Sequence, residues 1–403
     1  MKKILDRIKP TPKEERELKK VFSEIKSKIK IKDTKIIMGG STAKGTYLKN
    51  NHDIDIYVRF GEKKYAGLNI SAMLKKKLKF EGLRVLHGSR DYFQFEYKGF
   101  DIEVVPLIEI KNAKDAHNIT DISPLHVKWV KKHKNLTDEI RLVKAFCKSN
   151  GLYGAESYIR GFSGYSLEIL TIYYGGFEKM LKEVTKWKPK VIIDIERYYP
   201  KGNVLEELNR SKKTSPLILI DPVQATRNVT AVVGMDKFLL FKDLARKYLR
   251  AKKRDRFFVK NELNLEKLKK KHKDLFVFEA VPFEGKRDVV GAKLLKCYDY
   301  LFNKLKSNEF KVINSGWDWE GENAVFWYAL KEVKLTPKVK HYGPRKEHKD
   351  RLVHFKEKWG RVRYEEGVSF VMKERDFMHV EELFIAMLDD EYVGSKVVEL
   401  NRV

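Results

Sequence analysis

Two aspartates separated by one residue follow a short glycine-rich turn near the N-terminus. The turn is Gly39-Gly40-Ser41, and the aspartates are Asp53 and Asp55 in the run DIDIYVRF. Residues two apart in a β-strand point to the same face, so the two carboxylates would lie side by side. Such a pair is unfavourable without a cation, and Mg²⁺ prefers carboxylate and phosphate oxygens. Backbone N–H groups in the turn suit an anion such as phosphate.

A phosphate-binding turn beside metal-binding carboxylates indicates phosphoryl or nucleotidyl transfer. The two-metal form of that chemistry needs a third carboxylate from a neighbouring strand. In GFDIEVVPLIEI, the residues Asp101, Glu103 and Glu109 alternate onto one face. Glu103 is the predicted third metal ligand, and Asp101 is the alternative. The structural alternative for the aspartate pair is a solvated edge strand that follows a glycine turn.

These residues require a small mixed α/β framework, and the hydrophobic pattern predicts one over residues 12–110. An amphipathic helix over residues 12–30 begins at the cap Thr11-Pro12 with Glu14 as the capping glutamate. The remaining predicted elements are a strand at Lys35–Met38, a short helix after the glycine turn, a strand at Asp53–Phe60, a helix near Ile70–Lys79, and strands at Asp91–Tyr97 and Phe100–Ile110.

The rest of the chain divides by its pattern into two further regions. Residues 124–250 read as mostly helical, and the chain beyond residue 255 returns to mixed helix and strand. The clearest elements are helices at Leu136–Ser149, Ser163–Tyr174 and Gly291–Ser307 and strands at Phe310–Ser315 and Ala324–Val333. At 403 residues the chain exceeds one ordinary core. The prediction is an α/β multi-domain protein divided at residues 1–128, 129–254 and 255–403.

The composition favours a polyanionic partner. Lys and Arg number 84 against 56 Asp and Glu, a net charge of +28, and 12% of the residues are aromatic. Nucleic acid is the simplest such partner. A hot or salty habitat is the alternative, but such surfaces usually balance their signs. No apolar run approaches 18 residues and no signal peptide is evident, so the chain is predicted to be soluble, without a membrane segment, and cytoplasmic. Cys147 and Cys297 are predicted to be reduced core thiols.

Several long motifs in order resemble one family. GGSTAKGTYL followed by DID resembles the nucleotidyltransferase signature of the DNA polymerase beta superfamily. The segments NITDISPLHVKWVKKH, DEIRLVKAFCKSNGLYGAESYIRGFSGYSLEIL and DPVQATRNVTAVV resemble the archaeal (class I) CCA-adding enzymes, which are tRNA nucleotidyltransferases. GWDWEGENAVFWYALKE and GPRKEHKDRLVHF are more loosely similar to the tail of that family. The resemblance implies a nucleotidyltransferase head with a mixed sheet, a helical neck, and an α/β body and tail.

The resemblance also implies roles for individual residues. Asp53 and Asp55 match the metal-binding pair, and Glu103 stands where the family commonly has aspartate. The residues that match nucleotide-binding positions are Gly40, Ser41, Lys44, His126, Lys144, Tyr153 and Arg227. Relatives often carry arginine at position 44, so bidentate contact with phosphate would be lost there. Arg227 matches the residue that reads the incoming base, and its structural alternative is an arginine that braces the following helix.

For the family as a whole, the implied reaction is template-independent addition of CCA to the tRNA 3′ end from CTP, CTP and ATP. The implied cofactor is Mg²⁺, the implied partner is the tRNA acceptor arm, and a homodimer is left open. Basic residues that suit duplex RNA are Lys269, Lys273, Arg345, Lys346 and Arg351, together with Lys270, Lys271 and Lys356. The competing hypotheses are a poly(A) polymerase or another RNA 3′-tailing enzyme, and a catalytically dead RNA-binding protein.

Overall fold

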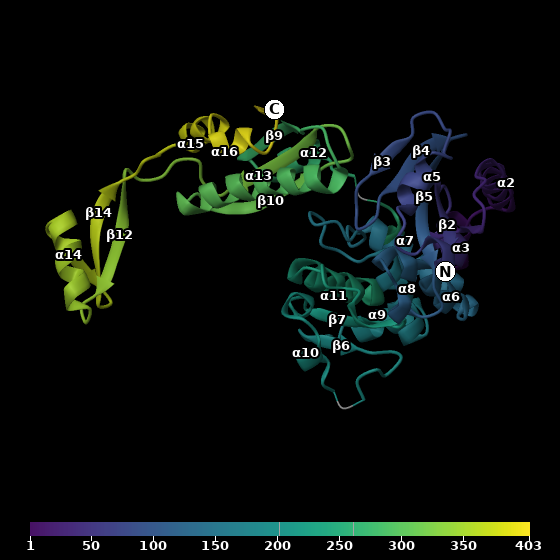
Figure 1. Cartoon of the computed structure of the whole chain (residues 1–403). Helices are drawn as coiled ribbons and strands as arrows, with labels where there is room; N and C mark the ends of the chain where they lie inside the picture. The colour runs from purple at the N-terminus through teal and green to yellow at the C-terminus, as the bar shows by residue number, and fades with distance from the viewer. Residues whose placement is uncertain (201, 261) are drawn as a thin grey trace. The chain divides into compact units, whose positions relative to one another are not determined.

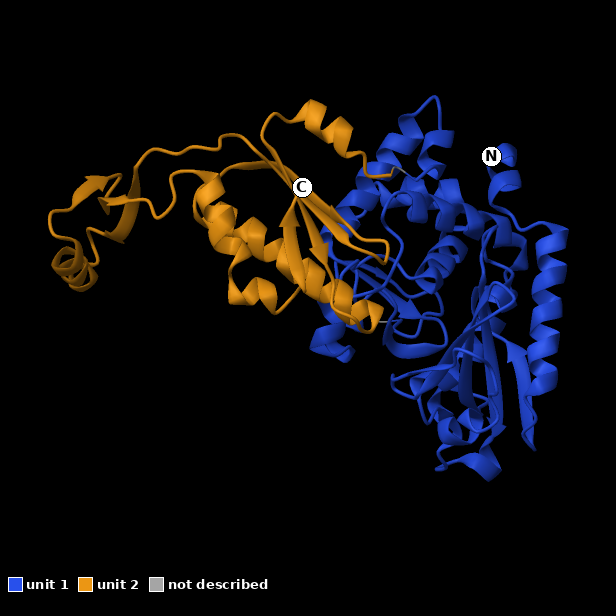
Figure 2. Cartoon of the chain, turned by 90° about the horizontal axis from the view of Figure 1, so that it is seen from above, with its two compact units in different colours: residues 1–261 blue, residues 262–403 orange. Residues whose placement is uncertain are grey.

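The computed structural model describes residues 1–200, 202–260 and 262–403. The chain forms two compact units, residues 1–261 and 262–403 (Figure 2). This boundary divides the chain in two, and the three-domain division at residues 128 and 254 stays a prediction. Among the described residues, no helix is long and apolar enough to cross a membrane. Both cysteines, Cys147 and Cys297, are buried and free, as predicted.

The N-terminal part of the first unit is built on a five-stranded sheet in the order β1-β2-β5-β4-β3 (Figure 1). Its strands are β1 (Thr34–Met38), β2 (Asp53–Gly61), β3 (Arg84–Leu86), β4 (Tyr92–Tyr97) and β5 (Phe100–Glu109), and its helices are α2 (Pro12–Lys28), α3 (Gly40–Lys44), α4 (Glu62–Tyr65) and α5 (Ile70–Lys75). The mixed α/β prediction is confirmed, and β2 lies between β1 and β5 rather than at an edge. The solvated edge-strand alternative is therefore wrong.

Strict alternation along β2 separates its two faces. Ile54, Ile56, Val58 and Phe60 are buried in the core of this part, while the aspartates lie on the opposite face. Helix α2 packs its own buried stripe, which includes Leu18 and Ile25, into the same core. Its predicted cap is confirmed: Thr11 and Glu14 form a reciprocal capping box. The core thus fixes which face of β2 carries the carboxylates.

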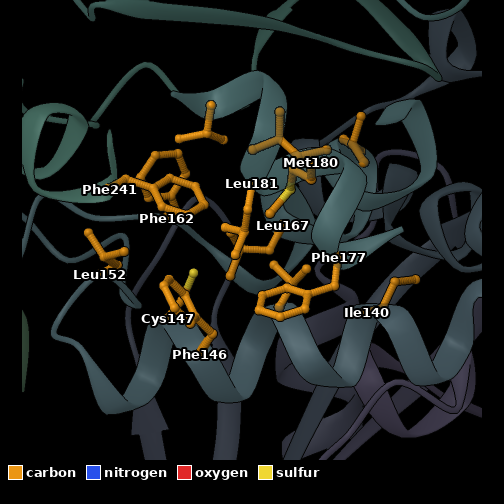
Figure 3. Packing of buried hydrophobic residues seen from close by; sticks show 14 of the residues in the cluster. Ile140, Phe146, Cys147, Leu152, Phe162, Leu167, Phe177, Met180, Leu181 and Phe241 are labelled. Atoms are coloured by element: carbon orange, nitrogen blue, oxygen red, sulfur yellow. The ribbon is translucent and has the colours of Figure 1, made fainter. Parts of the chain in front are cut away.

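The second part of the first unit is mostly helical. Its helices are α6 (Ser123–Lys131), α7 (Thr137–Ser149), α8 (Gly164–Tyr174), α9 (Phe177–Val184), α10 (Val204–Glu207) and α11 (Met235–Arg250), and α1 (Lys2–Ile8) joins them from the N-terminus. Buried side chains from these helices, among them Phe146, Leu167, Phe177 and Phe241, form one hydrophobic cluster (Figure 3). Helices α7 and α8 confirm the predicted helices at 136–149 and 163–174 to within a residue.

A small sheet interrupts this helical region, and the sequence pattern did not predict it. Strands β6 (Val191–Ile193), β7 (Leu217–Asp221) and β8 (Gln224–Asn228) form it in that order. All five residues of β7 are buried. A fully buried short strand has no polar alternation, so its periodicity cannot be distinguished from that of a buried helical segment. The tight β7–β8 hairpin brings Asp221 and Arg227 close together.

The second unit contains two separate sheets. A four-stranded sheet, order β10-β11-β9-β15, shares a core with α13 and α15, and a three-stranded sheet, order β12-β14-β13, pairs with α14. Its elements are α12 (Leu265–Lys271), β9 (Leu275–Val281), α13 (Arg287–Ser307), β10 (Val312–Asp318), β11 (Ala324–Leu330), β12 (Lys338–Arg345), α14 (Lys349–Trp359), β13 (Arg363–Glu365), β14 (Val368–Glu374), α15 (Val380–Leu388), α16 (Glu391–Gly394) and β15 (Glu399–Arg402). The predicted helix at 291–307 begins four residues earlier, at Arg287.

Candidate active site

The glycine turn lies directly on the face of β2 that carries the aspartates. A Cβ added to Gly40 would lie 1.6 Å from Asp55 Oδ2, and one added to Gly39 would lie 2.4 Å from the Tyr57 ring. Gly40 also has a φ of +51°. The Gly39 N–H donates to the Asp55 carbonyl oxygen at 2.8 Å, which fixes the turn on the strand. Ser41 follows in the first turn of α3. The sequence therefore needs glycine here so that the turn and the carboxylates can be adjacent.

The strand register sets the neighbours of the aspartates. Strands β2 and β5 are parallel, with Asp53 opposite Asp101 and Asp55 opposite Glu103. Burial, followed by the charge of Asp53, raises the pKa of Asp55 to about 6. Burial, followed by the charge of Asp55, raises the pKa of Glu103 to about 7. The carboxylates on this face thus raise one another's pKa values, as expected for a group that a cation would stabilise.

The donor chemistry of this face fits a hard divalent cation, although its side chains are not gathered as a closed ligand set. Among the described residues, no three His, Cys, Asp or Glu side chains are close enough to hold a metal ion. The Glu103 carboxylate instead accepts a hydrogen bond from Gln94 Nε2 at 3.0 Å. Asp101 is exposed and lies opposite Asp53. Glu109, at the far end of the strand, pairs with Arg59 and Lys35 and is separate from this group.

Lys44 and Lys144, which are 100 residues apart in the sequence, meet at one buried carboxylate. Each ammonium lies 2.7 Å from an oxygen of Glu168, whose side chain is 1% exposed. Lys144 also donates to Thr46 Oγ1 at 3.0 Å. Burial alone would raise the pKa of Glu168, but the two ammonium groups hold that pKa at about 2. The structure therefore brings the two predicted phosphate-binding lysines together, on a glutamate that the sequence analysis missed.

His126 and Arg227 meet at a second buried carboxylate, that of Asp221. His126 Nε2 lies 3.0 Å and an Arg227 guanidinium nitrogen 3.1 Å from Asp221 Oδ2. The Tyr165 hydroxyl donates to Asp221 Oδ1 at 3.1 Å. Burial lowers the pKa of His126 more strongly than the hydrogen bond to Asp221 raises it. Sequence reasoning singled out His126 and Arg227 but assigned no role to Asp221 or Tyr165.

Tyr165 connects the two groups. Its ring centroid lies 4.3 Å from that of His126, and Lys44 Nζ lies 4.7 Å from the same ring. Tyr165 and Glu168 are three residues apart in the first turns of α8, so they share one face of that helix. Two titratable side chains at this spacing, inside an otherwise apolar helix, were the feature of the sequence from which Tyr165 and Glu168 could have been identified as site residues.

Tyr153 lies beside the lysine group. A Cβ added to Gly164 would lie 2.7 Å from the Tyr153 hydroxyl oxygen and 3.6 Å from Lys144 Nζ. Burial raises the pKa of Tyr153, so the phenol stays protonated and can donate. The predicted nucleotide residues thus all lie in the first unit: Lys44 comes from its N-terminal part, and His126, Lys144, Tyr153 and Arg227 come from its helical part.

The predicted RNA-binding residues are exposed and lie in the second unit. Lys269 lies on α12 and Lys273 just beyond it, while Arg345 ends β12 and Arg351 lies on α14. Lys346 Nζ lies 4.5 Å from the centroid of the Tyr364 ring. The structure therefore divides these residues between α12 and the small three-stranded sheet with its helix.

Comparisons with known proteins cover almost the whole chain. Residues 16–140 match the model of a nucleotidyltransferase domain, residues 138–259 that of the second domain of tRNA nucleotidyltransferase, and residues 277–401 that of the C-terminal domain of CCA-adding enzymes. A CCA-adding enzyme from Nanoarchaeum equitans is 42% identical over 77% of this chain and 76% of its own. One from Methanocaldococcus jannaschii is 30% identical over 100% of this chain and 95% of its own.

Solved structures show a similar fold at low sequence identity. A Cid1 poly(U) polymerase is 15% identical with a TM-score of 0.52, over 64% of this chain and 97% of its own. A cytoplasmic RNA terminal U-transferase is 16% identical with a TM-score of 0.50, over 65% of this chain and 97% of its own. These two confirm the nucleotidyltransferase fold alone. With all three parts matched in order and a relative aligned over the full length, the chain belongs to the family of CCA-adding enzymes.

Proposed function

We propose that this protein adds CCA to the 3′ end of tRNA by successive nucleotidyl transfer from CTP, CTP and ATP, releasing pyrophosphate at each step. The observation that carries the proposal is the full-length relationship to CCA-adding enzymes. The site supports it, because the glycine turn, the carboxylate face and the two groups of nucleotide residues occur together in one unit.

The nucleotidyltransferase family uses divalent metal ions, and we propose Mg²⁺ here, held by Asp53, Asp55 and Glu103. When bound, the cation would favour deprotonation of the tRNA 3′ hydroxyl and neutralise charge on the leaving pyrophosphate. Glu103 is favoured over Asp101 as the third ligand because it stands opposite Asp55 and is partly buried. Its release from Gln94 would let its carboxylate join the aspartate pair.

The remaining candidate residues of the site bind and orient the nucleotide. Ser41 and the backbone of the turn face the phosphates, and Lys44, Lys144 and Tyr153 donate to phosphate oxygens. His126 donates to phosphate through Nδ1 when both of its ring nitrogens carry a proton, because Nε2 is engaged by Asp221. Arg227 reads the base, since its guanidinium has five N–H donors and one nitrogen contacts Asp221. The acceptor arm of tRNA binds the basic side chains of the second unit, and the cytoplasm remains the predicted location.

The test is incubation with tRNAs that lack CCA, CA or only the final A, each with one labelled nucleotide. We expect CTP to label the first substrate twice, the second once and the third not at all, while ATP supplied alone labels only the third substrate, once. Long tails made from ATP alone would favour a poly(A) polymerase instead. Absence of both turnover and CTP-dependent thermal stabilisation would favour a catalytically dead RNA-binding protein.

A further inference from the structure

Asp221 is a buried carboxylate at the junction of two kinds of nucleotide-binding side chain. We infer that Asp221 is a positioning residue for nucleotide selection, whose carboxylate holds the Arg227 guanidinium and the His126 imidazole in one fixed arrangement. The inference rests on the proposed function, because it assigns a role within the same nucleotide site. It extends that function by naming what orients the base-reading arginine.

All four hydrogen-bonding positions of this carboxylate are occupied. Oδ1 accepts from the Tyr165 hydroxyl at 3.1 Å and from the Val223 N–H at 3.0 Å. Oδ2 accepts from His126 Nε2 at 3.0 Å and from Arg227 at 3.1 Å. The Asp221 side chain is 0% exposed, whereas the Arg227 side chain is 36% exposed. Moving either partner away would leave a buried charge incompletely paired, which is costly.

This arrangement fixes the donors that a nucleotide would meet. An ionised carboxylate only accepts hydrogen bonds, so His126 Nε2 carries a proton and Nδ1 is the nitrogen left for a ligand, as a donor only when the ring is doubly protonated. The guanidinium is planar, so holding one of its nitrogens on Asp221 restricts the plane in which the others can donate. Burial would raise the pKa of Asp221, but His126 and Arg227 hold it below its ordinary value, and the carboxylate stays charged.

Loss of Asp221 should affect the choice between nucleotides more than it affects the binding of phosphate. Lys44 and Lys144 are held by Glu168, which is a different carboxylate. A guanidinium released from Asp221 keeps its donors but loses its orientation, and uracil and cytosine both offer O2 as an acceptor. Choice between nucleotides that share acceptors depends on donors held in fixed positions. Loss of Asp221 should therefore weaken the choice between CTP and UTP.

The experiment measures kcat/KM for CTP and for UTP on tRNA lacking CCA, using the full-length protein and Asp221→Asn. We expect the CTP-to-UTP ratio to fall by at least about tenfold, because hydrogen bonds to charged groups are stronger than those between neutral groups. The matched control is Asp121→Asn. Asp121 is equally buried, pairs with Arg90 in the same unit, and accepts from the Ile108 and Asn118 amides. That variant should lose thermal stability and keep the ratio.

A double-mutant cycle with Arg227→Ala separates positioning from a general structural role. If Asp221 acts through Arg227, adding Asp221→Asn to Arg227→Ala should leave the ratio where Arg227→Ala alone puts it. An unchanged ratio in Asp221→Asn, or a further independent loss in the double variant, would overturn the inference. Should Asp221→Asn not fold, Asp221→Glu carries the same test, since it keeps the charge and moves it by one methylene. A wild-type protein that adds no nucleotide to tRNA would overturn the proposed function itself.

Discussion

The carboxylates of β2 and β5 differ in what each can contribute to a metal site. Asp53 and Asp55 share a face with a period of two, and Asp55 and Glu103 are neighbours across a parallel ladder. Glu103 is one methylene longer than aspartate, and Gln94 holds it away from a closed ligand set. Single substitutions at these three carboxylates and at Asp101, which lies opposite Asp53, therefore test both the site and its register.

Asp53→Ala or Asp55→Ala should lower both C and A addition by at least about a thousandfold, because a catalytic metal contributes several kcal/mol. Affinity for tRNA should stay within a few fold of wild type, because phosphate contacts dominate RNA binding. Single-turnover addition and filter binding measure the two quantities. Glu103→Gln should be nearly as damaging as the aspartate variants. A harmful Asp101→Asn with a mild Glu103→Gln would assign the third ligand to Asp101.

At the scale of the element, α8 and α3 each carry a feature that the site requires. The first turns of α8 supply Glu168, the shared partner of two lysines, and Tyr165, the link to Asp221. Helix α3 (Gly40–Lys44) begins at Gly40 and is followed by Gly45, and both glycines have a positive φ. Only the first of these glycines contacts the carboxylate face, so the two offer a matched comparison.

Gly40→Ala should lose most nucleotidyl transfer, because its Cβ would displace the Asp55 carboxylate. Gly45→Ala is the control, since a Cβ there meets nothing within 4 Å although the φ of Gly45 is +72°. Both variants should lose about 1 kcal/mol of stability from backbone strain. Thermal unfolding and CTP addition would be measured together. Equal activity in the two variants would show that Asp55 tolerates the displacement.

The Glu168 group predicts a dependence of stability on acid. The pKa of Glu168 is about 2 in the folded protein against 4.5 for an ordinary glutamate, so its contribution is complete above about pH 4.5. That contribution, roughly 3 kcal/mol at most, is lost as the pH falls toward 2. Glu168→Gln should therefore lower the free energy of unfolding at pH 7. It should also reduce the loss of stability that occurs as the pH falls from about 4.5 toward 2. Urea unfolding at several pH values measures this.

The control for Glu168 is Glu183→Gln, which removes an exposed ion pair with Lys186. Exposed pairs contribute little, so this variant should follow the wild-type curve within about 1 kcal/mol. If Glu168→Gln loses stability with falling pH as steeply as the wild type does, Glu168 is not the group whose titration causes that loss.

At the scale of the whole molecule, the division at residue 261 separates the candidate active site from the predicted RNA contacts. The carboxylates, both lysines, His126, Tyr153 and Arg227 precede it, and the basic residues from Lys269 onward follow it. Nucleotide binding and most of the RNA contacts should therefore be separable by truncation.

A chain of residues 1–261 should still bind CTP but lose tRNA affinity and much of its salt dependence. Each phosphate contact removed should lower the slope of log affinity against log salt by roughly 0.7 to 0.9. Filter binding of tRNA across a salt series compares the two proteins, after CTP-dependent thermal stabilisation shows that the shorter chain is folded. An unchanged slope would place the phosphate contacts in the first unit.

The sequence by itself determined the features that depend on local spacing. The period of two placed Asp53 and Asp55 on one face, the capping residues located α2, and the pattern of α7 and α8 gave their bounds. The glycine pair also indicated a turn before β2, whereas its close contact with Asp55 and Tyr57 was not predicted. Each of these follows from residues within a turn or two of one another.

Only the tertiary structure decided which distant residues share a partner. Glu168 joins Lys44 to Lys144, and Asp221 joins His126 to Arg227, across separations that no periodicity records. The parallel pairing of β2 with β5 set Glu103 beside Asp55, because register depends on two strands and not on one. Buried carboxylates are costly unless paired, so their partners are fixed by packing of the whole unit. For that reason Asp221 and Glu168 became visible only in the folded chain.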